Sequence, residues 1–418
     1  MGYAVRAVDR DALIYDWNHH GERPQTPPQK LQLNDETLRD GMQSPAARTP
    51  TPEERLEHLH NCAAVGIHAL NLGLPGAGPH VVEQVEALAT EIRDSKLPLY
   101  PNCAARTVET DIRPIAEVSQ RVGIPIEAAT FIGSSQIRME VEGWDLEFLL
   151  RCTRDAVTFV KQQGLPSMFV TEDTVRATPQ LIRALYGAAI DSGADRIVVC
   201  DTTGHITPWG VRSLLGFIRS LLEEKGVLGK VELDWHGHMD RGLGVPNNLA
   251  AFGAGADRIH GTAMGIGERA GNAPLDLTMV NLKLMGWIDT DLRALGRYVR
   301  HAARAAGFQI PSTYPVFGSD AFETGTGVHA AAVIKALHRR DTWLANRVYS
   351  GVPADEFGLE QKIGVGPMSG KSNVLYWLET HGHEADDDLV DAIFAAAKGS
   401  RRLLTDEEIE AIVRGHGA

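Results

Sequence analysis

The feature that most constrains the fold is an alternation of short β-rich runs with stretches of helical periodicity. Eight β-rich runs occur in the first two thirds of the chain, beginning at Leu31, His68, Leu97, Ile124, Ser167, Arg196, Val231 and Asp257. Strands that alternate with helices form parallel sheets, and eight units within about 260 residues are typical of a barrel. An open doubly wound sheet usually carries GxGxxG after its first strand, whereas this chain has NDETLRDGMQ. We therefore predict an α/β fold with a (β/α)8 TIM barrel over residues 30–287.

The two ends of the chain depart from this pattern. After the barrel, residues 288–418 carry helical runs with little strand, such as 292–308, 330–344 and 386–397. The segment 310–320, IPSTYPVFGSD, is rich in turn formers and is predicted to be a loop. We expect residues 288–418 to form mainly helical accessory subdomains and residues 1–29 to form an N-terminal extension.

Composition excludes several classes of protein. The 418 residues carry a net charge of −13, which argues against nucleic-acid binding because that needs a basic face. The four cysteines form no CxxC pair, a pattern typical of a reducing compartment. We recognise neither an apolar run of the ~20 residues that span a bilayer nor a secretory signal. The expectation is a cytoplasmic protein that binds neither membranes nor nucleic acids.

Polar side chains stand where two of the predicted barrel strands end. In VELDWHGH, His236 and His238 are two residues apart, so they point to the same side of a strand. Two imidazoles arranged in this way can bind one metal ion. After the first strand, Asp40 could supply an oxygen ligand to the same ion, and Arg39 could stabilise an enolate or a substrate carboxylate. Because barrel enzymes place catalysis at this end of the strands, we predict a metal-dependent site there.

Five ordered motifs identify a family resemblance. They are LNDETLRDGMQ (33–43), TEDTVRATP (171–179), DTTGHITP (201–208), HGHMDRGLGVPNNLAAFGAGA (236–256) and GIGERAGN (265–272). Together they resemble the acyl-CoA-condensing branch of the DRE-TIM metallolyases, which holds the 2-isopropylmalate, homocitrate and citramalate synthases. In the tail, AFETGTGVHAAAVIKA (321–336) and VYSGVPADEFG (348–358) look like the accessory region of these synthases. That tail favours condensation over the cleavage catalysed by lyases of the hydroxymethylglutaryl-CoA type.

The resemblance implies a set of site residues. Metal ligands would be Asp40, His236 and His238, with Asn272 in or near the coordination sphere; Mg, Mn and Zn all fit such a set. Substrate-binding residues would be Arg39, Arg106, Ser135, Glu172 and Thr202. Arg39 and Glu172 would also be catalytic, and His329 and Tyr349 from the tail would complete the site around acetyl-CoA. Because the tail of related synthases reaches the partner's barrel, the resemblance also implies a homodimer.

The chemistry implied by the resemblance is a Claisen-type condensation of acetyl-CoA with a 2-oxo acid, followed by thioester hydrolysis. His329 or Glu172 would remove the proton from the acetyl methyl group. The leading expectation is a 2-isopropylmalate synthase of leucine biosynthesis, acting on 2-oxoisovalerate, without a C-terminal leucine-sensing domain. Two departures from the family pattern bear on the acceptor: Asn71 stands where a glutamate is common, and Arg138 replaces the usual histidine.

These departures leave alternatives open. A homocitrate, citramalate or phosphonomethylmalate-type synthase would keep the reaction and change the 2-oxo acid. A hydroxymethylglutaryl-CoA-type lyase would cleave a 3-hydroxyacyl-CoA instead. A catalytically silent member would have no need to retain Arg39, Asp40, His236 and His238.

Overall fold

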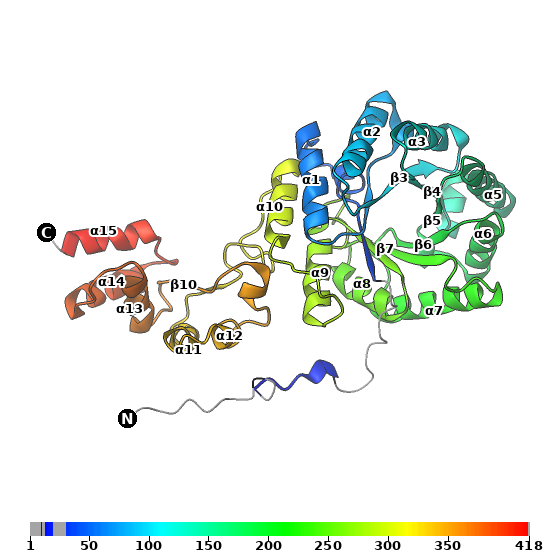
Figure 1. The fold of residues 1–418 in the computed structure, drawn as a ribbon. Coiled ribbons are helices and arrows are strands. Elements are labelled where there is room, and N and C mark those ends of the chain that lie inside the picture. The colour runs from blue at the N-terminus through cyan, green and yellow to red at the C-terminus, as the bar shows by residue number, and fades with distance from the viewer. Residues whose placement is uncertain (1–9, 11–12, 20–30, 417–418) are drawn as a thin grey trace.

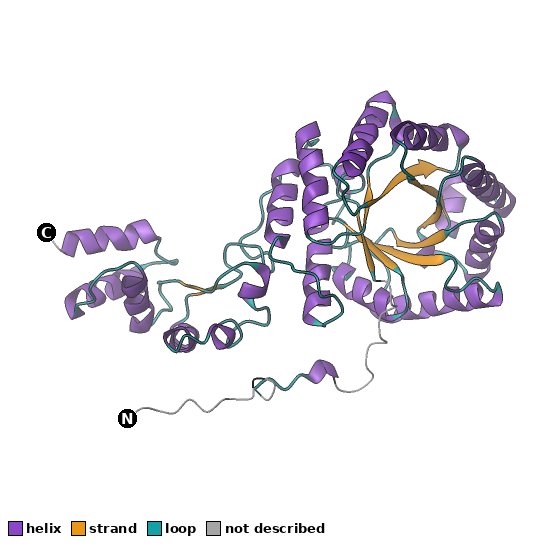
Figure 2. Cartoon of the chain, in the orientation of Figure 1, coloured by secondary structure: helices purple, strands orange, loops and turns teal. Residues whose placement is uncertain are grey.

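The computed structural model describes residues 10, 13–19 and 31–416. Eight parallel strands close into a barrel in chain order, each paired with the next and β8 paired with β1 (Figures 1 and 2). The strands are β1 (Gln32–Asp35), β2 (Ala69–Asn71), β3 (Tyr100–Arg106), β4 (Glu127–Gly133), β5 (Ser167–Glu172), β6 (Arg196–Asp201), β7 (Glu232–Gly237) and β8 (Arg258–Gly261). The predicted (β/α)8 barrel is confirmed.

Helices surround the barrel and connect successive strands (Figure 2). They are α1 (Pro52–Ala64), α2 (Pro79–Asp94), α3 (Glu109–Val122), α5 (Leu146–Gln162), α6 (Pro179–Asp191), α7 (Pro208–Glu224), α8 (Gly244–Gly253) and α9 (Leu275–Leu284). A short additional helix, α4 (Gln136–Glu142), precedes α5. Thr-Pro sequences open two of these helices: Thr51 and Glu54 form a capping box at α1, and Thr178 caps α6.

One strand lies later in the chain than its sequence pattern indicated. The run that starts at Leu97 favoured a strand over 97–102, but β3 spans Tyr100–Arg106 and ends in the residues Cys103 to Arg106. Alanine is a poor strand former on propensity alone. Burial between the barrel interior and the surrounding helices overrides this preference, because Ala104 and Ala105 are both buried.

Charged side chains occupy much of the barrel interior beneath the site. Arg258 is buried and donates from Nε to Asp234 Oδ2 at 2.7 Å and from Nη2 to Glu127 Oε2 at 2.7 Å. Arg196 also pairs with both carboxylates. The main apolar core instead lies between the sheet and the helices, where residues such as Leu70, Phe169 and Trp235 pack. Buried ions of this kind are stable only when each has its partners.

The accessory region begins beside the barrel and then extends away from it. Its elements are α10 (Leu295–Ala306), β9 (Glu323–Thr324), α11 (Gly327–His338), α12 (Thr342–Ala345), β10 (Lys362–Ile363), α13 (Lys371–Thr380), α14 (Asp387–Gly399) and α15 (Asp406–His416). Helix α10 packs on α1, whereas α13, α14 and α15 lie farthest from the barrel (Figure 1). These last three helices have an apolar core of their own, which includes Val374, Leu378 and Ile393.

The accessory helices agree in part with the sequence pattern. The loop over 310–320 is confirmed, and the single run over 330–344 divides into α11 and α12 at Arg340, whose φ is 56°. Most of the predicted extension 1–29 lies outside the described residues, and the predicted boundary at 287/288 stays a prediction. Among the described residues, no helix is both long and apolar enough to cross a membrane.

Candidate active site

Three side chains meet at the end of the barrel where the strands terminate. His236 is in β7, His238 follows that strand, and Asp40 stands in the loop after β1. Asp40 Oδ2 lies 3.4 Å from His236 Nε2 and 3.7 Å from His238 Nε2, and the two Nε2 atoms are 3.2 Å apart. The barrel closure that pairs β1 with β8 and β8 with β7 brings these residues together across more than 190 positions of sequence.

The donor set fits a divalent cation. Asp40 Oδ2 is buried and accepts no hydrogen bond from any residue that the structure describes. Asn272 Oδ1 is also buried and accepts no hydrogen bond from the described part of the chain. The amide nitrogen of the same side chain donates to the Ile266 carbonyl at 3.2 Å, which fixes the orientation of the amide. Asn272 also forms a backbone bridge with His238. Buried acceptors without donors are costly, and a cation would satisfy both of them.

The ionisation states of these groups also suit metal binding. Burial, and after it the neighbouring His236, lowers the pKa of His238 to about 4, so the imidazole keeps a lone pair at neutral pH. Burial by itself would raise the pKa of Asp40, but Arg39 and the two histidines hold it well below its usual range. An ionised carboxylate and neutral imidazoles are the forms that coordinate a metal.

Arg269 bears on the tautomer of His238. Its Nη2 lies 3.2 Å from His238 Nδ1 and also donates to the Thr202 carbonyl at 2.5 Å, while its Nε donates to Asp240 at 2.9 Å. Coordination through His238 Nε2 places the imidazole proton on Nδ1. The guanidinium then loses an acceptor there and retains Asp240 and Thr202 as partners.

Arg39 is clamped between two carboxylates at the rim of this site. Its Nη1 donates to Asp40 Oδ1 at 2.9 Å, and its Nη2 pairs with Glu36. Burial alone would lower the pKa of Arg39, but Asp40 and Glu36 raise it above its usual value, so the guanidinium is always charged. Its Nε is buried and has no partner among the residues that the structure covers. This N–H is a donor that a substrate oxygen could accept from.

Two further predicted residues meet in a neighbouring pocket. Glu172 ends β5, and Thr202 follows β6. They share a pocket of about 210 Å³ whose remaining lining residues are Ile137, Arg138, Val141, Asp173, Arg176 and Thr203. Thr202 Oγ1 accepts a hydrogen bond from the Asp173 amide at 2.8 Å, which fixes the Thr202 side chain at the pocket wall.

Ser135 and Arg106 have local partners of their own. Ser135 is the N-cap of α4 and accepts from the Arg138 amide at 3.3 Å. Arg106 ends β3 and makes a two-point contact with Asp111, at 2.7 and 2.9 Å. Neither residue lines the pocket that contains Glu172. Their assignment as substrate-binding residues stays a prediction.

His329 and Tyr349 lie together but outside the barrel of their own chain. His329 is on α11 and Tyr349 follows α12, and their ring centroids are 4.2 Å apart. Helix α11 packs on α12 and α13, beyond the ring of barrel helices (Figure 1). The tail therefore brings these two residues to each other and does not bring them to Asp40 in the same chain.

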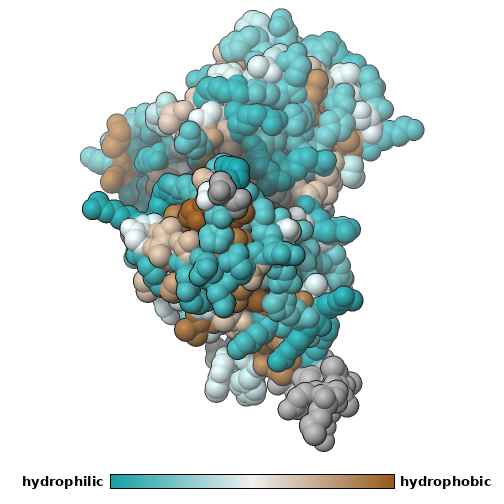
Figure 3. Space-filling view, turned by 90° about the vertical axis from the view of Figure 1, so that its left-hand side faces the viewer, coloured by the Kyte–Doolittle hydropathy of each residue, from teal (hydrophilic) through white to brown (hydrophobic). Residues whose placement is uncertain are grey.

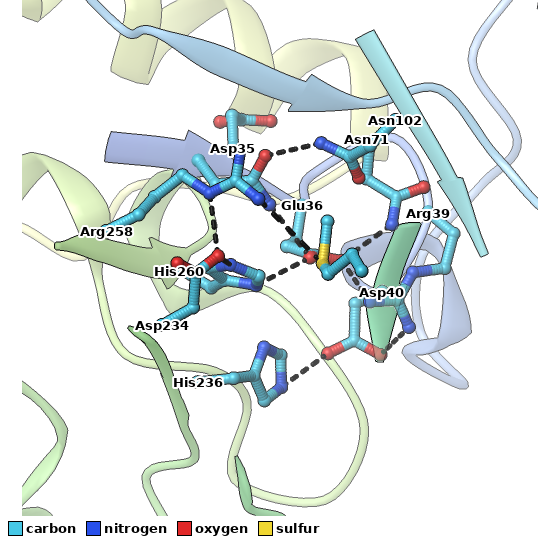
Figure 4. Close-up of polar contacts among 12 residues, drawn as sticks. Asp35, Glu36, Arg39, Asp40, Asn71, Asn102, Asp234, His236, Arg258 and His260 are labelled. Atoms are coloured by element: carbon cyan, nitrogen blue, oxygen red, sulfur yellow. Dashed lines mark hydrogen bonds and ion pairs between the residues drawn. The ribbon is translucent and has the colours of Figure 1, made fainter. Parts of the chain in front are cut away.

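A polar network beneath the site was not recognised in the sequence. Figure 4 shows Glu36 between Arg39 and Asn71 on one side and His260 and Asp234 on the other. The signal is present in the strands, because inward positions alternate. The pairs Asp234 and His236 in β7 and Arg258 and His260 in β8 are spaced two apart, as are Asn34 in β1 and Glu36 just after it.

Two other clusters have metal-like composition, but their donor atoms are already engaged. Asp35, His58 and Cys62 form one group. Asp35 Oδ1 accepts from the Thr37 amide at 2.8 Å and lies 3.1 Å from His58 Nε2, and Asp35 Oδ2 pairs with Tyr298. Glu36, His236 and His260 form the other group, in which both ring nitrogens of His260 face carboxylates. The group of Asp40, His236 and His238 retains unused donor atoms.

Comparison with known proteins finds relatives over most of the chain. A family model described as HMGL-like matches residues 30–298. The chain is 30% identical over 393 residues to a homocitrate synthase from Methanopyrus kandleri, covering 93% of this chain and 92% of that protein. It is 31% identical over 400 residues to a 2-isopropylmalate synthase from Pyrococcus furiosus, covering 92% of this chain and 76% of that protein.

A solved structure shares the fold. The hydroxymethylglutaryl-CoA lyase from Pseudomonas aeruginosa is 16% identical and superposes with a TM-score of 0.55. The superposition covers 67% of this chain and 94% of the lyase. At this identity the likeness concerns the barrel fold alone.

Proposed function

The chain is an enzyme of the HMGL-like family, and we propose that it condenses acetyl-CoA with a 2-oxo acid and then hydrolyses the thioester. The observation that carries the proposal is the set of Asp40, His236 and His238 at the barrel mouth, where one buried oxygen on Asp40 and one on Asn272 accept no hydrogen bond from the described residues. Relatives over nearly the whole chain are named as synthases of this kind.

The acceptor we propose is 2-oxoisovalerate, which makes the chain a 2-isopropylmalate synthase of leucine biosynthesis. The pocket beside Glu172 has aliphatic walls from Ile137 and Val141, which suit a branched aliphatic side chain. The guanidiniums there already have carboxylate partners: Arg176 pairs with Asp173 at 2.7 Å and Arg138 with Glu142 at 3.1 Å. A second anionic group on the acceptor would have to compete with them.

A second candidate acceptor is 2-oxoglutarate, which would make the enzyme a homocitrate synthase. Arg138 Nε is buried and has no hydrogen-bond partner among the described residues. It lies 3.9 Å from Glu172 Oε1, which is too far for a hydrogen bond, so its N–H is not engaged by Glu172. A distal carboxylate could accept from this N–H. Pyruvate, which would give citramalate, and phosphonopyruvate are further outcomes of the test below.

Each residue group has a role in the proposed reaction. A divalent cation held by Asp40, His236, His238 and Asn272 would act as a Lewis acid on the acceptor's keto group. Arg39, whose Nε–H has no partner among the described residues, would present this donor and its positive charge to oxygens that become negative during the condensation. Glu172 stands at the end of β5, where a base could take the proton from the acetyl methyl group.

His329 and Tyr349 would act in the barrel of a partner subunit, so the active enzyme would be a homodimer. The tail carries apolar side chains that no described element covers, including Val328 at 75% and Met368 at 71% exposure. In the view from the accessory side, hydrophobic residues lie among hydrophilic ones on this face (Figure 3). The barrel mouth also carries an exposed apolar side chain, because Val141 on α4 is 74% exposed. Burying these residues between two copies would favour association.

The direct test is release of CoA from acetyl-CoA, followed with a thiol reagent. The acids to compare are 2-oxoisovalerate, pyruvate, 2-oxoglutarate, oxaloacetate and phosphonopyruvate, each with and without EDTA. Fastest release with 2-oxoisovalerate, abolished by EDTA and restored by Mg²⁺ or Mn²⁺, supports the proposal. Preference for another acid replaces the acceptor, and no release with any acid contradicts the synthase function and favours a lyase assay.

A further inference from the structure

Glu36 is a buried carboxylate to which the proposed reaction gives no role, and its two oxygens are fully engaged. Oε1 accepts from Asn34 Nδ2 at 2.9 Å and faces His260 Nδ1 at 3.0 Å. Oε2 accepts from Asn71 Nδ2 at 3.2 Å and pairs with Arg39 Nη2. Figure 4 shows His260, Asn71 and Arg39 around Glu36. With four donors on two oxygens, Glu36 is suited neither to accept a proton nor to bind a metal.

The support for Glu36 extends through the barrel interior. His260 Nε2 lies 2.8 Å from Asp234 Oδ2, and its Nδ1 lies 3.0 Å from Glu36 Oε1. Both ring nitrogens face carboxylates, so both must carry protons to make these contacts. Asp234 is held in turn by the buried guanidiniums of Arg258 and Arg196. The chain of charges ends on groups that cannot move without unpairing a buried ion.

The consequence of this support falls on Arg39. Its other carboxylate partner is Asp40, whose second oxygen faces the two histidines of the candidate metal site. A cation in that site would attract the negative charge of Asp40 and weaken the ion pair between Asp40 and the Arg39 guanidinium. The contact with Glu36 does not depend on the cation, because Glu36 is held by His260, Asn34 and Asn71 instead.

Asn71 gives this arrangement a particular form in this chain. It stands where a glutamate is common in the family, and from β2 its amide donates to Glu36 Oε2, the same oxygen that pairs with Arg39, whereas Glu36 lies just after β1. The carboxylate next to the guanidinium therefore comes from position 36, with an amide at position 71.

We propose that Glu36, fixed by the His260–Asp234 pair, is the positioning residue that orients Arg39 toward the reacting oxygens. This role rests on the proposed condensation. Glu36 acts through Arg39 and does not itself touch the substrate. Its removal should therefore lower kcat while leaving binding of the metal and of the 2-oxo acid in place.

The test begins with Glu36→Gln, which keeps the shape of the side chain and removes its charge. We expect kcat to fall about 10- to 100-fold, with KM for both substrates within about twofold. Calorimetric binding of Mn²⁺, and of the 2-oxo acid in the presence of Mn²⁺, should stay within the same range. The matched control is Glu224→Gln, which neutralises an exposed, ion-paired glutamate on α7 and should leave kcat unchanged.

Two further variants separate positioning from a purely structural role. In Glu36→Gln combined with Asn71→Glu, a carboxylate returns beside Arg39 from the neighbouring strand, and we expect at least about threefold recovery of kcat. In an Arg39→Met background, Glu36→Gln should cause no further loss, because its effect passes through Arg39. Far-UV circular dichroism and the thermal midpoint show whether each variant is folded.

The outcomes are distinct. A wild-type enzyme that releases no CoA with any 2-oxo acid overturns the proposed function and this inference with it. An active wild type whose kcat is unaffected by Glu36→Gln overturns the positioning role alone. Additive losses in the Arg39→Met background, or a parallel collapse of kcat, Mn²⁺ binding and thermal midpoint without recovery in the double variant, also overturn it.

Discussion

The ionic interior of the barrel makes a quantitative prediction for Arg258→Met. Methionine approximates the length of the arginine side chain, so the main change is the loss of a buried positive charge between Asp234 and Glu127. Asp234 keeps Arg196 and His260 as partners, whereas Glu127 keeps only the 3.3 Å contact with Arg196 Nε among the ion pairs of the described residues.

The expected cost follows from that asymmetry. Breaking a buried ion pair by removing one partner typically costs about 3–5 kcal/mol, because the remaining charge is stranded in the interior. Glu127 is the stranded group, so adding Glu127→Gln to Arg258→Met should return about 2 kcal/mol. The exposed pair Arg183–Glu224 provides the control, and Arg183→Met should cost no more than about 1 kcal/mol.

The assay is urea-induced unfolding followed by far-UV circular dichroism. Unfolding rates at a fixed urea concentration replace it where refolding is incomplete. The reasoning is refuted if Arg258→Met loses less than about 1 kcal/mol, as an exposed pair would. It is equally refuted if Glu127→Gln adds a further loss to the Arg258→Met variant, because the carboxylate would then not be the source of the cost.

Three other predictions follow from the site and the tail. Asp40→Asn should weaken Mn²⁺ binding at least about tenfold in calorimetry and abolish metal-dependent CoA release; unchanged affinity would remove Asp40 from the ligand set. Burial raises the pKa of Asp276 to about 6, so the folded state holds this proton more tightly. The contribution of Asp276 to the free energy of unfolding is fully present below pH 4 and should be lost as the pH rises to about 6, a decrease on the order of 3 kcal/mol. Asp276→Asn should reduce this pH dependence of the free energy of unfolding, measured from unfolding curves at each pH. Mixing the Asp40→Asn and His329→Ala enzymes should restore about one quarter of wild-type activity if each tail serves its partner's barrel; no recovery would contradict that arrangement.

The barrel was predictable because its signals are local. Thr51 and Thr178 cap their helices, and runs such as RIVVCD indicate strands because they are short, apolar and rich in β-branched residues. Propensity was a poorer guide in β3, where Cys103, Ala104 and Ala105 form strand only because the barrel buries them. It also missed the break between α11 and α12 at Arg340.

The sequence predicted which residues form the candidate metal site, but it did not predict how their atoms are arranged. The two-residue spacing of His236 and His238 and the position of Asp40 after the first strand can both be recognised in the local sequence. That Asp40 Oδ2 and Asn272 Oδ1 are both buried and unpaired among the described residues depends on how the loops after β1 and β8 fold over the mouth. Likewise, Ser135 and Arg106 carry plausible chemistry in the sequence, yet their first partners in the structure are Arg138 and Asp111.

The sequence by itself determined the barrel, the strand ends at which polar residues gather and the family to which the chain belongs, because periodicity, caps and ordered motifs are properties of neighbouring residues. Only the tertiary structure decided that Glu36 lies against His260 and Asn71, and that His329 and Tyr349 pair outside the barrel. These contacts arise from barrel closure and from the path of the tail, which bring together residues far apart in the chain. No pattern among neighbouring residues in the sequence predicts these contacts.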